Sequence, residues 1–162
     1  MTTDTLTSAV EQTDAALSGL ADTLAGLGDG ALHLAHRDGG WTPAELVSHI
    51  NGSVLAWTAT LSRVQHDPEL VLVLREEIGH DLKGYPPPTV EAALQHLASA
   101  RRTLATVVPA ISTDVLSRAL TIPDLGTLTV EAWTPPILGH AAGHAQQALD
   151  VLQDRGALEA SA

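Results

Sequence analysis

The chain has 162 residues, a formal net charge of −11 and no cysteine. Its eight Lys and Arg residues are scattered, which argues against nucleic-acid binding, because phosphate neutralisation requires clustered positive charge. The lack of cysteine excludes disulfides, thiolate metal ligands and a cysteine nucleophile.

The length predicts one domain over residues 1–162. The first residues have neither the basic region nor the apolar run of a signal peptide, and no segment is long and apolar enough to span a bilayer. We therefore expect a soluble, cytoplasmic protein.

Hydrophobic periodicity predicts two amphipathic helices in the first half of the chain. The first covers residues 6–27 and ends among glycines. The second begins at Pro43, because Thr42 and Glu45 have the spacing of a capping box and proline suits the first helical position. It runs to about His66, where Asp-Pro follows.

Two more long helices are predicted in the second half. One follows Thr89 as its cap and ends at Pro109, and the last begins after Thr129 or Thr134 and ends at residues 155–156. Together the four helices favour an all-α four-helix bundle, in which ligand and metal sites are commonly built from side chains on facing helices.

The connections between these helices are less regular. Residues 69–80 fit either a helix or a strand, residues 112–120 fit a short helix, and residues 121–129 fit a tight turn or small hairpin.

Three histidines are candidates for one shared site. His140 and His144 are four residues apart on the last predicted helix, so both rings lie on one face about one turn apart. His49 falls at the edge of the apolar face of the second helix, which suits a ligand directed into a cleft. The alternative is that all three are polar or half-exposed residues without a role.

Two sequence blocks carry a family resemblance. They are the tryptophan-led block 41–49 and the block 126–129 leading into His140-x-x-x-His144-x-x-Gln147, about ninety residues apart. With them, the chain resembles the DinB/YfiT-like superfamily of metalloenzymes over most of its length. The resemblance implies a four-helix bundle whose metal is held by His49, His140 and His144.

The resemblance also implies homodimerisation and an activity. The implied activities include S-transfer of low-molecular-weight thiols such as bacillithiol or mycothiol, and a mycothiol-dependent isomerisation. Gln147 matches the motif, and we expect it to orient a ring nitrogen that does not bind the metal.

Three neutral imidazoles leave a divalent ion its full charge and an open position. Such an ion can hold a thiol as thiolate or lower the pKa of bound water to roughly 7. Zinc is the first expectation, and nickel and iron also accept three histidines. The sequence thus favours a metal-dependent enzyme that activates a small thiol. The alternatives are a metal-dependent hydrolase or tailoring enzyme, and a bundle that binds a small molecule or protein without catalysis.

Two features complicate this prediction. Pro135 and Pro136 precede His140 by a few residues, so the helix should kink or start afresh with Thr134 as its cap. We expect the site to survive, because both histidines lie beyond the prolines. His80, beside Asp81, is a further candidate for the mouth of a pocket.

Overall fold

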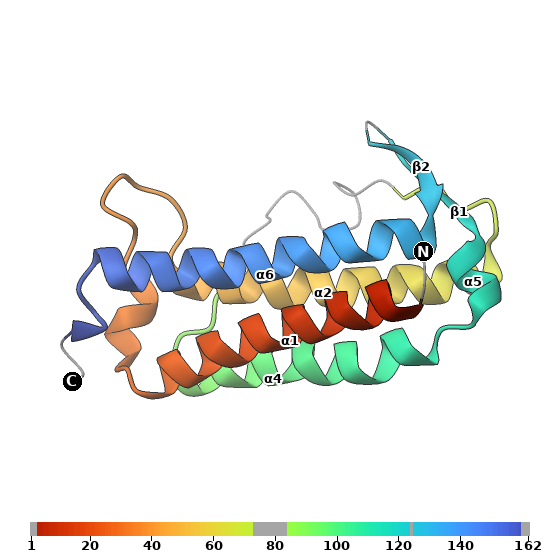
Figure 1. Cartoon of the computed structure of the whole chain (residues 1–162). Helices are drawn as coiled ribbons and strands as arrows, with labels where there is room; N and C mark the ends of the chain where they lie inside the picture. The colour runs from red at the N-terminus through yellow and green to blue at the C-terminus, as the bar shows by residue number, and fades with distance from the viewer. Residues whose placement is uncertain (1–2, 73–83, 124, 160–162) are drawn as a thin grey trace.

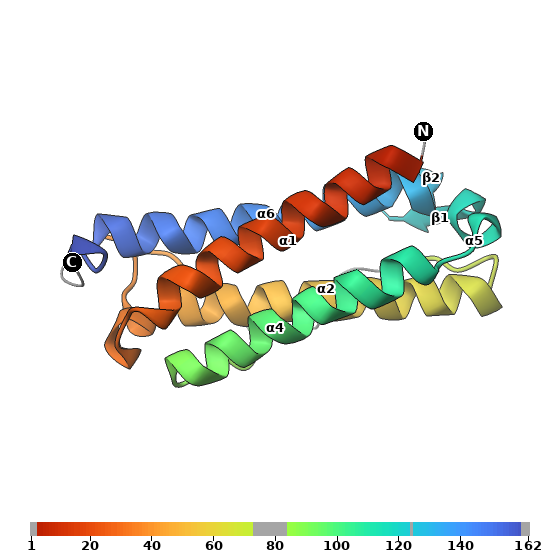
Figure 2. The same cartoon turned by 60° about the horizontal axis from the view of Figure 1, so that its bottom comes forward.

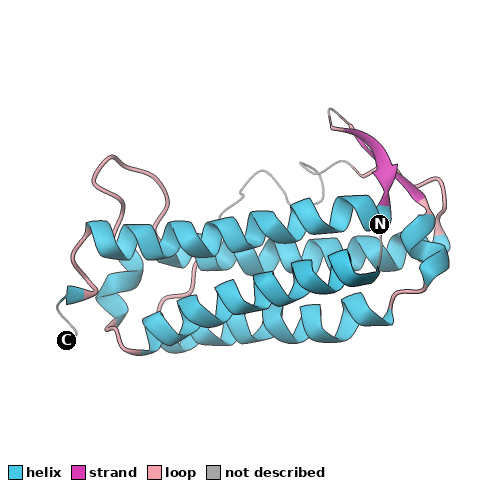
Figure 3. Cartoon of the chain, viewed as in Figure 1, coloured by secondary structure: helices cyan, strands magenta, loops and turns pink. Residues whose placement is uncertain are grey.

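The computed structural model describes residues 3–72, 84–123 and 125–159. Its architecture is a four-helix bundle with one small hairpin (Figures 1 and 3), which confirms the predicted fold class. The long helices are α1 (Thr3–Ala25), α2 (Pro43–His66), α4 (Val90–Val107) and α6 (Val130–Asp154). None of the helices in the described part of the chain has a stretch long and apolar enough to cross a membrane.

The helices form a closed ring in which α1 packs on α4 and α6, and α2 packs on the same two helices. In Figures 1 and 2, α2 and α4 run in one direction, and α1 and α6 run in the other. The neighbours α2 and α6 are therefore antiparallel, so the start of α2 lies beside the C-terminal half of α6.

The core of the bundle is aliphatic and alanine-rich, as expected for a chain without phenylalanine. Small buried residues on α6 allow the helices to approach closely, among them Ala141, Ala145 and Ala148.

Local chemistry fixes the start of α2. The Thr42 hydroxyl accepts a hydrogen bond from the Glu45 backbone N–H at 3.3 Å, and the Glu45 carboxylate accepts one from the Thr42 N–H at 2.8 Å. With Pro43 as first residue, this is the predicted capping box, and α2 has the predicted bounds. His49 is thereby held in the second turn of a well-defined helix.

Three short elements join the bundle at its ends. They are the 3₁₀ helices η1 (Asp29–His33) and η2 (Val108–Ala110) and the helix α5 (Thr113–Ser117). The short helix predicted over residues 112–120 is thus only partly correct, because the chain is already in a strand from Ala119. The predicted end of the third helix is close to the observed one, with Pro109 inside η2.

The small hairpin pairs β1 (Ala119–Ile122) with β2 (Gly126–Thr129) in antiparallel register, Ala119 opposite Thr129 and Ile122 opposite Gly126. It is tied to α6 because the Trp133 indole N–H donates to the Leu120 carbonyl at 2.9 Å. Leu72, in the segment that follows α2, donates its N–H to the Thr121 carbonyl at 2.9 Å. This bond holds the segment beside β1. Most of the segment 69–80, including His80, lies outside the described residues.

The prolines of α6 do not start a new helix at Thr134. The helix begins after Thr129, whose side chain accepts from the Ala132 N–H, and it continues through Pro135 and Pro136. Pro135 and Pro136 lack the N–H groups that would bond to the carbonyls of residues 131 and 132, so two intrahelical bonds are missing. Both of those residues are partly exposed, so water can satisfy the carbonyls.

A bidentate ion pair links α1 to α4. Arg101 donates to the two Asp14 oxygens at 2.7 and 3.0 Å, and this hydrogen bond lowers the pKa of the Asp14 carboxyl, with burial opposing and charge attraction adding to it. Both side chains keep more than a third of their surface exposed, so solvent screens the pair.

We predict that Asp14→Asn lowers the free energy of unfolding at pH 7 by about 0.5 kcal/mol, within the range of exposed ion pairs. Because the pKa of Asp14 is lower in the folded state, the stabilisation is present above about pH 4 and disappears as the pH falls through the folded value. Urea unfolding at pH 7 and pH 3 measures the loss of unfolding free energy and its dependence on pH. Glu11→Gln, on the same helix, is the control. An equal loss of stability at both pH values would contradict the electrostatic explanation.

Candidate metal centre

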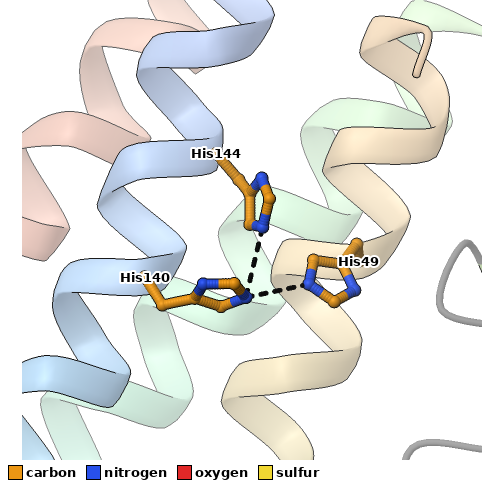
Figure 4. A group of neighbouring side chains, drawn as sticks. All are labelled: His49, His140 and His144. Atoms are coloured by element: carbon orange, nitrogen blue, oxygen red, sulfur yellow. Dashed lines mark hydrogen bonds between the residues drawn. The ribbon is translucent and has the colours of Figure 1, made fainter. Parts of the chain in front are cut away.

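The three candidate histidines converge between α2 and α6 (Figure 4). His140 Nε2 lies 3.1 Å from His49 Nε2 and 3.1 Å from His144 Nε2. The ring atoms available as ligands all lie within 4.8 Å of one another. The structure thus brings together the three residues that the sequence singled out, and such a group could hold a metal ion.

The spacing fits one ion well. Two nitrogens that each bind the same zinc ion at ~2.0–2.1 Å in tetrahedral geometry lie about 3.3 Å apart. The observed Nε2 separations of 3.1 Å are close to that value.

The two hydrogen bonds at His140 Nε2 cannot both form fully at once. A neutral imidazole nitrogen either donates one proton or accepts through one lone pair. His140 Nε2 faces two other Nε2 atoms, so it can pair fully with only one of them. A cation that accepts lone pairs from all three nitrogens satisfies the whole arrangement.

Gln147 fixes the orientation of one ring. Its side-chain oxygen lies 2.9 Å from His144 Nδ1, and an amide oxygen can only accept. His144 therefore carries its proton on Nδ1 and presents a lone pair at Nε2, toward the other histidines. This is the contact expected for Gln147 from its place in the motif.

The environment favours the neutral form of His140. Although His140 as a residue is exposed, partial burial of its ring lowers its pKa, and positive charge on His144 or His49 would lower it further. His49 is 5% exposed and lies against the core. Neutral rings are the form that binds metals.

Two further side chains lie beside the histidines. Trp41 stacks on His144 with ring centroids 5.9 Å apart and meets His49 edge-on at 5.0 Å. Ser53 lies one turn after His49, and its Oγ is 3.4 Å from His49 Nε2. No sequence pattern predicted the stacking of Trp41 on His144. Trp41 precedes the helix, so the direction of its side chain depends on the loop before it.

A cavity continues from the histidines along the same two helices. Its volume is about 270 Å³, and His140, Ser53, Trp57 and Trp133 are among its lining residues. On α2 the lining residues follow His49 at helical spacing, and on α6 they precede His140 in the same way. The metal centre therefore lies at one end of a pocket for a small molecule.

Comparisons with known proteins identify the family. The family model of the DinB superfamily matches residues 11–148, and the chain therefore belongs to the DinB superfamily. No match is found among proteins of curated function.

Among solved structures, the fold is similar to that of YfiT from Bacillus subtilis, with a TM-score of 0.73 and 15% sequence identity. The similarity covers 96% of this chain and 90% of YfiT, which is described as a probable metal-dependent hydrolase with an unusual four-helix bundle topology. At this identity the similarity shows a common fold.

We predict that Gln147→Leu weakens zinc binding by about 10- to 100-fold, because His144 then loses the acceptor that orients its ring. Gln147→Glu should restore most of the affinity, since a carboxylate accepts the same N–H. Competition with a chromophoric chelator measures the affinities.

The matched control is Gln146→Leu, at the neighbouring position, where the side chain donates to Asp150 on the surface. Its zinc affinity should equal that of the wild type. If Gln147→Leu also binds zinc like the wild type, Gln147 does not orient His144.

Proposed function

We propose that this protein is a metal-dependent enzyme acting on small molecules, and that it uses its three histidines to activate a low-molecular-weight thiol. The observation that carries the proposal is the convergence of three histidine Nε2 atoms from α2 and α6 at the end of a cavity. A divalent ion held there, with zinc as first candidate, would lower the pKa of a thiol or a water molecule that it binds.

The ligand set suits activation of an anion. In the described part of the chain the three histidines form a group without a carboxylate, so the site's own charge does not offset that of a divalent ion. A net positive centre favours the anionic form of the bound molecule. The protein's part is to keep His140 neutral by burial and to aim His144 through Gln147.

The choice of a thiol over water as the nucleophile depends on how many protons each must lose during the reaction. Metal-dependent hydrolysis usually employs a carboxylate or histidine as general base beside the metal. The residues described as lining the cavity include none besides His140, which is itself a proposed ligand. A thiolate has lost its only proton before its sulfur bonds to the electrophilic carbon and the leaving group departs with the electrons of the broken bond. A metal-bound hydroxide still carries a proton that hydrolysis must move.

The lack of cysteine is consistent with this chemistry, because the chain has no thiol of its own for an electrophile to modify. Mycothiol and bacillithiol are the thiols to test first, in S-transfer and in isomerisation. The cytoplasmic location and homodimerisation remain predictions.

The second candidate is a metal-dependent hydrolase, and the description of YfiT favours it. In that case the histidines would activate water, and the cavity would hold an ester or amide. The two candidates share the metal centre and differ in the nucleophile.

The test compares metal content and thiol consumption in tag-free wild type, His140→Ala and His66→Ala. His66 is an exposed histidine at the end of α2, far along the helix from His49, and serves as control. We expect about one divalent ion per chain and metal-dependent conjugation of mycothiol or bacillithiol to monochlorobimane in the wild type and in His66→Ala. His140→Ala should lose the ion, with a rate at least about 100-fold lower.

Other outcomes separate the alternatives. A metal-loaded protein that hydrolyses p-nitrophenyl acetate but consumes neither thiol would favour the hydrolase. A chain that binds no metal even after incubation with divalent ions would contradict both enzymes and leave a binding bundle.

A further inference from the structure

The hydroxyl of Ser53 lies where the metal centre meets the cavity. Ser53 follows His49 by four residues on α2, so both side chains lie on one face of the helix, and Ser53 Oγ is 3.4 Å from His49 Nε2. Ser53 is half-buried and is also among the residues that line the cavity. It therefore borders both the proposed metal ligands and the space for a substrate.

The hydrogen bond between Ser53 and His49 is a weak one. Its length of 3.4 Å exceeds the ~2.7–3.2 Å that is usual in proteins. In the described part of the chain, His49 Nε2 is the hydrogen-bond partner found for the Ser53 hydroxyl. The position of this hydroxyl is thus not explained by a strong bond within the protein.

Metal binding would remove this partner. His49 directs its Nε2 atom toward His140 (Figure 4), and a neutral imidazole nitrogen has a single lone pair to offer. Once that lone pair binds an ion, the nitrogen can neither accept a hydrogen bond nor donate one. The Ser53 O–H then needs another acceptor, because a hydroxyl held away from water without one is destabilising.

The distances allow this acceptor to be a further ligand of the ion. Zinc lies about 2.1 Å from a histidine nitrogen and about 2.3 Å from a sulfur. Because Ser53 Oγ is 3.4 Å from His49 Nε2, it lies at most about 5.5 Å from an ion bound to that atom. A sulfur bound to the ion on the side of Ser53 therefore comes within hydrogen-bonding distance of Oγ.

The other donors among the described lining residues are engaged or inaccessible. The Thr60 hydroxyl and the Trp133 indole N–H each donate to a backbone carbonyl at 2.9 Å. The Trp57 indole nitrogen is fully buried, so a molecule in the cavity does not reach it. Ser53 is therefore the lining residue best suited to donate to a ligand of the ion.

We propose that Ser53 donates a hydrogen bond to the sulfur of the metal-bound thiolate and holds it on the cavity side of the metal centre, facing the electrophile. In this role Ser53 is a catalytic residue, because it touches a reacting atom, whereas Gln147 acts only through His144. The inference rests on the proposed function, since it requires an ion held by the three histidines.

A hydrogen bond from Ser53 favours anionic ligands of the ion over neutral ones. A thiolate sulfur keeps further lone pairs after it binds the ion, and hydrogen bonds to charged acceptors are the stronger ones. An imidazole molecule that binds the ion through its one lone pair has none left to accept the bond. Loss of the hydroxyl should therefore weaken the binding of a thiolate and leave that of imidazole unchanged.

The test measures ligand binding to cobalt(II) in the full-length wild type and in Ser53→Ala. Cobalt is used because its visible absorption changes when a further ligand binds. Each protein is titrated at one fixed pH with 2-mercaptoethanol and, separately, with imidazole. We expect Ser53→Ala to bind cobalt and imidazole like the wild type, and 2-mercaptoethanol about tenfold more weakly.

Ser62→Ala is the matched control. Ser62 lies further along α2, is exposed and is not among the described residues that line the cavity. Its affinities for cobalt, 2-mercaptoethanol and imidazole should equal those of the wild type. Alanine has a higher helix propensity than serine, so both variants should keep the helix intact.

Three results would overturn the inference and leave the metal centre in place. They are equal 2-mercaptoethanol affinities of Ser53→Ala and the wild type, an equal loss of affinity for both ligands, and a cobalt-loaded wild type that binds no 2-mercaptoethanol. A wild type that binds no cobalt would contradict the proposed function together with the inference. If Ser53 strengthens thiol binding but the zinc-loaded protein consumes no thiol, the inference holds and the proposed thiol chemistry is wrong.

Discussion

The packing of α2 against α6 is the contact on which the rest of the site depends. The two helices are antiparallel, so His49, near the start of α2, lies opposite His140 and His144 in the middle of α6 (Figures 1 and 4). The same direction reversal places Trp57 and Trp133 together further along the interface. One interface thus forms both the metal centre and the pocket that extends from it.

This arrangement places three weak bases in a partly buried space. Positive charge on any one ring disfavours protonation of His140, and burial acts in the same direction on its pKa. His140 Nε2 lies 3.1 Å from two other ring nitrogens and can form a full hydrogen bond with only one of them. A divalent ion bound by all three histidines would join the two helices, so its binding should stabilise the folded chain.

Much of this could be predicted from the sequence, because local signals determined it. The bounds of α2 follow from Thr42, Pro43 and Glu45, and the shared face of His140 and His144 follows from their four-residue spacing. The start of α6 could not be decided from the sequence, which allowed Thr129 or Thr134 as the cap. The structure has Thr129 as the cap, so the helix continues through Pro135.

The pocket could not be predicted, since it depends on relations between distant residues. Trp57 and Trp133 are both buried tryptophans at helical positions, and nothing in their sequence context tells which indole has a partner. That difference arises because Leu120, in the hairpin, reaches only Trp133. The contact of Trp41 with His144 likewise requires the fold, because the two residues are 103 positions apart in the chain.

The most direct test of the central claim is a crystal structure of the full chain grown with zinc, with data collected at the zinc absorption edge. The account predicts one anomalous peak between α2 and α6, about 2.0–2.1 Å from the Nε2 atoms of His49, His140 and His144. A structure in which zinc occupies only other positions, while these three rings remain in contact with each other, would contradict it.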